Sequence, residues 1–273
     1  MPISRRGFLG GAAFALGAAP GADFPLVDYH CHLDAEVTLD KALAISRERG
    51  VKFGIVAHAG KRQYSYSGLI SNDRELRTYL ATLAGKPVFK GIQAEGVDWM
   101  ECFSKDAVAE LDYVLTDALT FPEKDGRLVR IWTPAAHVDD KQDWMERYTA
   151  FNVRVVERQP IDILANPTFL PEPIAGEYDA LWTPARMRRI IDAAVTCRVA
   201  IEINSRYRLP GMAFLRMARD AGAKFSFGSN IHGLDVGRLD YCLTAARELG
   251  LTRRHMWAPQ PPGRKPIQVR KIA

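Results

Sequence analysis

The motif His30-Cys31-His32 is the first group in the sequence whose residue types and spacing could support chemistry. Residues two apart on a β-strand point to the same side, so both imidazoles can reach one ion. Imidazole nitrogens, together with carboxylates, are good ligands for zinc, manganese or iron. An HxH motif by itself is common by chance, so its interpretation depends on what other residues accompany it.

Further potential ligands follow short apolar segments along the chain: His58, Glu95, Asp117, Asn166, Asn204 with Glu202 before it, and then Asn230 and His232. Each has a plain structural alternative. His58 could be a hydrogen-bonded core histidine, and Glu95 could be half of a buried ion pair. Their recurrence at successive strand ends favours one shared site, because independent loops have no reason to repeat the pattern.

Such a site requires a scaffold that brings the ends of several strands together. From residue 25 onward, apolar β-branched runs alternate with segments of helical periodicity. Strands are predicted over residues 26–30, 53–58, 88–95, 113–117, 161–166, 199–204 and 224–229. Helices are predicted to begin near residues 39, 73, 105, 141, 184 and 212, with a last helix over 236–249.

Seven βα units in series predict parallel strands with helices outside them, as in an α/β barrel. The strand ends of a barrel converge on its carboxyl-terminal face, where active sites lie. An open doubly wound sheet is the main competing fold, but no GxGxxG sequence follows the first strand. Residues 120–138 form the least regular segment, and we expect them to be a loop over the catalytic face.

The N-terminus predicts export. Ser4-Arg5-Arg6-Gly7-Phe8-Leu9 precedes a short run rich in glycine and alanine, and this arrangement resembles a twin-arginine signal over residues 1–22. The alternative is a disordered basic N-terminus. The apolar run is too short and too rich in glycine to span a bilayer stably. We therefore expect a periplasmic or otherwise exported protein, without stable membrane insertion after signal cleavage, whose catalytic domain covers residues 23–273.

Composition is typical of a soluble globular protein. The chain has 273 residues, of which 47% are hydrophobic and 25% charged, which fits one large domain. The net charge of +5 includes the N-terminal arginines and a basic tail, and no basic stripe with interleaved aromatics predicts nucleic-acid binding. Four scattered cysteines without a CxxC spacing do not require disulfides, and the oligomeric state is left open.

Four segments together resemble the PHP family, named for polymerase and histidinol phosphatase domains. They are Val27-Asp28-Tyr29-His30-Cys31-His32, Gly91-Ile92-Gln93-Ala94-Glu95, Ile201-Glu202-Ile203-Asn204-Ser205 and Phe227-Gly228-Ser229-Asn230-Ile231-His232. The resemblance covers about residues 25–235. It implies a distorted (β/α)7 TIM-like barrel that holds up to three divalent ions, and a phosphoesterase that uses metal-activated water.

The same resemblance implies a ligand set. His30 and His32 look like ligands of one ion, with Glu95 bridging to a neighbour, and His58 and His232 look like ligands of a second. Asp117 and Asn166 stand where the family usually has histidines, and Asn230 stands where it has an aspartate. Asparagine offers only a neutral carbonyl oxygen, so we expect one or two ions rather than three. Asp34 and Asp40 are candidates for a further early ligand that has no clear equivalent.

The expected chemistry is hydrolysis of a small anionic substrate by metal-activated water. Glu95, Asp117 and His232 are the candidate catalytic residues, and Asp117 could be either a ligand or a general base. Arg62, Arg206 and Arg208 follow strand ends and are candidates for binding a phosphate or carboxylate.

Two other functions stay open. Amidohydrolase barrels, which hydrolyse amides and lactones, begin with a similar HxH strand. They also have a lysine in the middle of the barrel and a late aspartate, and this sequence has neither at a matching position. A catalytically degenerate barrel that only binds a metal or ligand is the third possibility, and Asn166 and Asn230 are its best support.

Overall fold

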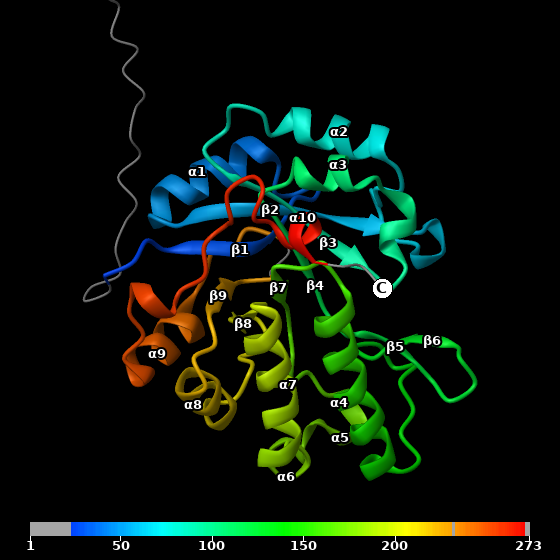
Figure 1. The fold of residues 1–273 in the computed structure, drawn as a ribbon. Coiled ribbons are helices and arrows are strands. Elements are labelled where there is room, and N and C mark those ends of the chain that lie inside the picture. The colour runs from blue at the N-terminus through cyan, green and yellow to red at the C-terminus, as the bar shows by residue number, and fades with distance from the viewer. Residues whose placement is uncertain (1–22, 231–232, 271–273) are drawn as a thin grey trace, which may run out of the picture.

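The computed structural model describes residues 23–230 and 233–270, and within them seven parallel strands close into a barrel (Figure 1). In barrel order, the strands are β1 (Val27–His32), β2 (Lys52–Gly60), β3 (Phe89–Glu95), β4 (Tyr113–Thr116), β7 (Ile163–Leu164), β8 (Ala200–Asn204) and β9 (Phe225–Gly228). The predicted α/β barrel is therefore confirmed. The predicted export signal and His232 lie outside the described residues and stay predictions.

Helices between the strands cover the outside of the barrel (Figure 1). The longer ones are α1 (Leu39–Arg49), α2 (Asp73–Thr82), α4 (Lys141–Arg158), α7 (Pro184–Cys197), α8 (Met212–Asp220) and α9 (Asp240–Leu249). The shorter ones are η1 (Arg62–Tyr64), η2 (Trp99–Cys102), α3 (Lys105–Ala109), α5 (Glu172–Ala175), α6 (Tyr178–Leu181), η3 (Arg253–His255) and α10 (Pro266–Val269). Across residues 23–230 and 233–270, no helix has the length and apolar character needed to cross a membrane.

The helix boundaries follow the local capping chemistry. The side chains of Thr38, Asn72 and Asp140 accept hydrogen bonds from backbone N–H groups in the first turns of α1, α2 and α4. Gly50 ends α1 in the left-handed conformation, which glycine adopts without steric penalty. The last long helix, α9, begins at Asp240 rather than at the predicted residue 236.

The segment over residues 120–138 is more regular than predicted. It contains an antiparallel hairpin of β5 (Thr120–Pro122) and β6 (Leu128–Arg130), which stands beside the barrel (Figure 1). The ring of Phe121 packs edge-on against Trp144 of α4, with 5.3 Å between ring centroids. Strands of three residues are too short to give a readable alternation of polar and apolar residues, which explains why the hairpin escaped prediction.

The barrel interior is apolar at the amino ends of the strands. Tyr29 packs against Tyr113 and Trp257 with ring centroids 5.4 and 5.0 Å apart, and Phe89 stacks on its other side. Gly91 on β3 makes room for this cluster, because a Cβ atom at that position would overlap the ring of Tyr113. Aromatic side chains thus fill one end of the barrel, and the polar residues face the other end.

A buried carboxylate closes the barrel where β1 meets β9. The backbone register between these strands is limited to the pair Asp28 and Phe227. The Asp28 carboxylate accepts hydrogen bonds from the backbone N–H groups of His30, Ser229 and Gly237 and from the Ser229 hydroxyl, at 2.5–3.1 Å. The hydrogen bonds of this one side chain therefore join β1 to the segment after β9, where few backbone hydrogen bonds connect the two strands.

Candidate functional site

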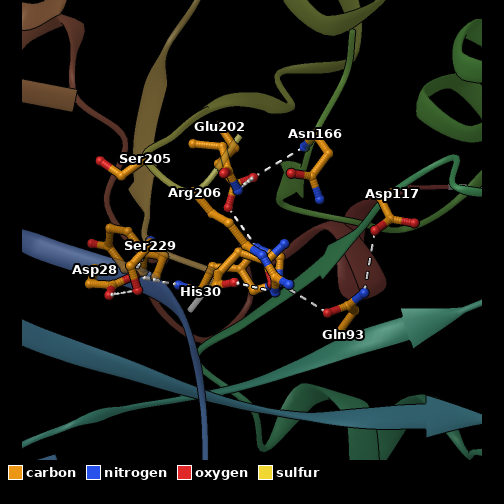
Figure 2. Close-up of polar contacts among 12 residues, drawn as sticks. Asp28, His30, Gln93, Asp117, Asn166, Glu202, Ser205, Arg206 and Ser229 are labelled. Carbon is orange, nitrogen blue, oxygen red and sulfur yellow. Dashed lines mark hydrogen bonds and ion pairs between the residues drawn. The ribbon is translucent and has the colours of Figure 1, made fainter. Parts of the chain in front are cut away.

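The polar residues at the carboxyl ends of the strands converge inside the mouth of the barrel (Figure 2). Alternation along each strand explains the convergence: Gly91, Gln93 and Glu95 share the inner face of β3, while Ile92 and Ala94 belong to the outer apolar core. His30, His32, Glu95 and Asn166 are all buried. The structure thus brings together the described candidates from β1, β2, β3, β4 and β7.

His30 is held by hydrogen-bonding partners on both ring nitrogens. Its Nδ1 lies 2.7 Å from Oε1 of Glu202, and its Nε2 lies 3.0 Å from Oε1 of Gln93. Burial acts to lower the pKa of His30, but the negative charge and hydrogen bond of Glu202 outweigh it and raise this pKa above its ordinary value. Gly228 is required beside this pair, because a Cβ atom there would overlap the Glu202 carboxylate.

Glu202 is tied into the site at its second oxygen as well. Oε2 accepts hydrogen bonds from the Asn166 backbone N–H at 3.1 Å and from Nδ2 of Asn204 at 3.0 Å. A carboxylate that fixes the Nδ1 side of a histidine orients the ring so that Nε2 faces the site, an arrangement common around metal-binding histidines. Glu202 is therefore a positioning residue for His30.

His32 and His58 form an aromatic stack with Tyr66. The ring centroids of His32 and His58 lie 4.6 Å apart, and those of His58 and Tyr66 lie 4.0 Å apart. His58 Nδ1 lies 2.6 Å from Oε1 of Glu95. Burial, and then the positive charge of His30, lower the pKa of His58 to about 4. His58 is therefore a neutral imidazole at neutral pH, the form that binds a cation.

The carboxyl groups of buried Glu95 and half-buried Asp117 lie in the same space. Burial raises the pKa of Glu95 to about 8, against a hydrogen bond from Tyr66 that lowers it. Burial, and then the charge of Glu95, raise the pKa of Asp117 to about 7. Within the described chain, neither carboxyl group forms an ion pair with a lysine or an arginine. Such carboxyl groups favour a nearby cation, because a cation would compensate the charge that burial penalises.

Asn166 is the clearest sign of an incomplete polar network. It leaves strand conformation with a φ of 48°, which ends β7 at Leu164 rather than at the predicted residue 166. Its side chain is buried beside Asp117, whose pKa it lowers, yet neither its Oδ1 nor its Nδ2 forms a hydrogen bond of good geometry. A buried polar group without a good partner costs about 1–3 kcal/mol, so this side chain favours a ligand that would satisfy it.

The donor set fits a divalent cation in its chemistry, since it combines imidazole nitrogens, carboxylates and an amide oxygen at one buried place. Among the residues that the structure describes, however, no three His, Cys, Asp or Glu side chains are grouped as ligands of one ion. Asn230 is described, and its backbone N–H bonds to the His30 carbonyl oxygen at 3.0 Å. The two other early candidates lie elsewhere: Asp34 caps the loop after β1, and Asp40 stands in the first turn of α1.

The three candidate substrate-binding arginines have different surroundings. Nη1 of Arg206 donates to the carbonyl oxygen of Asn230 at 3.0 Å, which places it beside the site. Arg208 lies over the ring of Tyr241 on α9. The guanidinium of Arg62 pairs with Glu75 and donates to the Leu69 carbonyl oxygen, so it is engaged with its own loop and helix.

Sequence reasoning missed two residues of the site. Gln93 could have been found, because it lies two residues before Glu95 and therefore on the same face of β3. Arg130, at the end of β6, lies with its guanidinium 4.5 Å from the centre of the Tyr66 ring, and its charge lowers the pKa of Glu95. Its position depends on how the β5–β6 hairpin folds back, which no local sequence signal encodes.

Comparison with known proteins supports the fold. Neither protein-family models nor curated protein sequences match this chain. A solved structure of histidinol phosphate phosphatase from Lactococcus lactis, complexed with Zn, L-histidinol and phosphate, is similar with a TM-score of 0.57. The similarity covers 90% of this chain and 99% of that chain at 14% sequence identity. It agrees with the closed barrel described above and with the fold that the sequence predicted.

Proposed function

We propose that this chain is a metal-dependent hydrolase that acts on a phosphate ester of a small molecule. The observation that carries the proposal is a group of three buried or half-buried histidines beside two carboxyl groups, one buried and one half-buried. The histidines are His30, His32 and His58, and the carboxyl groups belong to Glu95 and Asp117. The similar barrel that was solved with Zn and phosphate supports the choice of metal and substrate class.

The protein groups divide into holding, positioning and proton-handling roles. His30, His32, His58 and Glu95 would hold the metal, and Glu202 orients His30. A divalent cation, when bound, supplies Lewis acidity that makes water more acidic and withdraws charge from a phosphoryl oxygen. The Asp117 carboxyl group, whose pKa is raised to about 7, is suited to take up or release a proton near neutral pH. Arg206 is placed to bind the anionic part of the substrate.

The test is turnover by protein that has been stripped of metal and then reloaded with zinc, manganese or iron. We expect hydrolysis of phosphate esters that depends on added metal and is lost in Asp117→Asn. The exposed Asp139, which pairs with His137, provides a matched control, and Asp139→Asn should retain activity. Metal-dependent hydrolysis of amides or lactones, without hydrolysis of phosphate esters, would instead favour the amidohydrolase alternative.

A non-catalytic metal- or ligand-binding barrel is the second candidate, and one observation favours it. Asn166 and Asn230 stand where stronger ligands would complete a metal site, and no three His, Cys, Asp or Glu side chains of the described chain are grouped as ligands. Turnover distinguishes this function from a hydrolase. Tight metal binding without turnover across phosphate ester, amide and lactone panels would support binding alone.

A further inference from the structure

Gln93 lies where the two histidines of the HxH motif meet. Its side chain is buried on the inner face of β3, 7% exposed, between Gly91 and Glu95. The amide Oε1 atom lies 3.0 Å from Nε2 of His30 and 3.0 Å from Nε2 of His32. The Nε2 atoms of both imidazoles therefore lie close to one atom, the Gln93 amide oxygen.

The orientation of the Gln93 amide follows from its other end. Its Nε2 lies 3.4 Å from Oδ2 of Asp117, a carboxylate that can only accept when ionised (Figure 2). The NH₂ group therefore faces Asp117, which leaves the carbonyl oxygen facing the two histidines. This assignment presents a cation-binding atom to the site rather than a hydrogen-bond donor.

The distance from Oε1 to each imidazole nitrogen suits neighbouring ligands of one ion. Ligand atoms about 2.1 Å from a cation lie roughly 3.0 Å apart in octahedral geometry and roughly 3.4 Å apart in the tetrahedral geometry that zinc prefers. Both nitrogen-to-oxygen distances in the structure are 3.0 Å, so a bound ion requires little or no movement of the amide. Glutamine carbonyl oxygens are regular ligands of divalent cations, although weaker than carboxylates.

We propose that Gln93 is a metal ligand, binding through Oε1 the same ion as His30 and His32. The inference rests on the proposed metal-dependent function and adds a residue to it. It also accounts for the absence of three grouped His, Cys, Asp or Glu side chains in the described part of the chain, because one member of the group is a glutamine. The Gln93 amide adds no negative charge, so the ion keeps more of its charge for an anionic substrate than it would with a carboxylate at this position.

The competing explanation is that Gln93 only accepts hydrogen bonds from the two imidazoles and occupies the place that an ion would take. The two explanations predict opposite effects of removing the amide. A lost ligand weakens metal binding, whereas a lost competitor leaves it unchanged or strengthens it.

The experiment measures the dissociation constant of Zn²⁺ by competition with a chromophoric chelator, for the parent, Gln93→Leu and Gln93→Glu. Gln159→Leu is the matched control, because Gln159 also makes two hydrogen bonds, to Trp99 and Val97, but outside the site. We expect Gln93→Leu to bind Zn²⁺ at least about tenfold more weakly, with Gln159→Leu unchanged. Gln93→Glu should bind more tightly than the parent, because a carboxylate replaces the neutral oxygen.

A Gln93→Leu variant that binds Zn²⁺ as tightly as the parent, or more tightly, overturns the assignment of Gln93 while leaving the metal-dependent function intact. If Gln93→Leu does not fold, the Glu variant decides, and binding no tighter than the parent overturns the assignment. The visible absorption of bound Co²⁺ adds a second readout, which should change in the Gln93 variants and not in Gln159→Leu. A parent that takes up no Zn²⁺ removes the proposed function and this inference together.

Discussion

Replacing Glu95 by glutamine should stabilise the metal-stripped protein, and increasingly so as the pH rises. The pKa of Glu95 is raised by burial from an ordinary value of 4.5 to about 8. Between these values the folded carboxyl group keeps a proton that the unfolded chain has released. The free energy of unfolding therefore falls as the pH rises through this window. Glutamine has no such proton, so its advantage over glutamate grows from pH 4.5 to pH 8.

The expected size follows from the same shift. At pH 7.5, roughly three pH units above the ordinary pKa, the upper bound is about 4 kcal/mol at 1.36 kcal/mol per unit. Half of that, about 2 kcal/mol, corresponds to a rise in melting temperature of about 4–8 °C for a domain of this size. Loss of the contact between Glu95 and His58 is a separate effect that does not grow with pH in this way. The increase in the stabilisation by Glu95→Gln between pH 5 and pH 7.5 therefore measures the raised pKa of Glu95.

The assay is thermal unfolding of chelator-treated parent and Glu95→Gln at both pH values. Glu48→Gln, on the exposed side of α1, is the control and should show no pH-dependent difference. If the difference in melting temperature between Glu95→Gln and the parent is the same at pH 5 and pH 7.5, the carboxyl group is not held protonated by burial. The electrostatic description of the site would then be wrong.

Three further variants test separate parts of the structure. Glu202→Gln should weaken Zn²⁺ binding by about 10- to 100-fold while the barrel stays folded, because His30 loses the carboxylate that orients it; chelator competition measures this. Asp28→Asn should lower the free energy of unfolding in urea by about 2–4 kcal/mol, because its amide group cannot accept every hydrogen bond at the β1–β9 seam; an unchanged urea midpoint would contradict that role. Arg206→Ala should raise KM for a phosphate ester by about tenfold with unchanged metal content, as measured by steady-state kinetics. Arg74→Ala, at an exposed position of α2, is the control and should leave KM unchanged.

Much of the fold was predictable because it is encoded locally. Apolar runs, helical periodicity and capping residues such as Asn72 and Asp140 fix where elements begin, and serial βα units leave few topologies. The errors occur where tertiary structure decides. Asn166 turns into a left-handed conformation to meet Glu202, which shortens β7. The β5–β6 hairpin is stabilised by packing of Phe121 on α4 rather than by its own sequence pattern.

The candidate site was predictable to the extent that it follows the strands. His30, His32 and Glu95 lie at strand ends, and parallel strands bring their ends together whatever the loops do. Gln93 required a second step, namely applying the two-residue alternation backwards from Glu95. Arg130 could not be placed from sequence, because its contact with Tyr66 depends on a hairpin whose direction is set by distant packing.

The central claim, that the barrel mouth holds a divalent cation, is tested most directly by the metal content of the purified protein. Elemental analysis should compare the parent with a His30→Ala, His32→Ala double variant. The control is His255→Ala, which removes a histidine of η3 that is not part of the site. The account predicts about one or two equivalents of a divalent metal in the parent and in His255→Ala, and the loss of at least one in the double variant. A folded parent that takes up no divalent metal, even when supplied in excess, would contradict it.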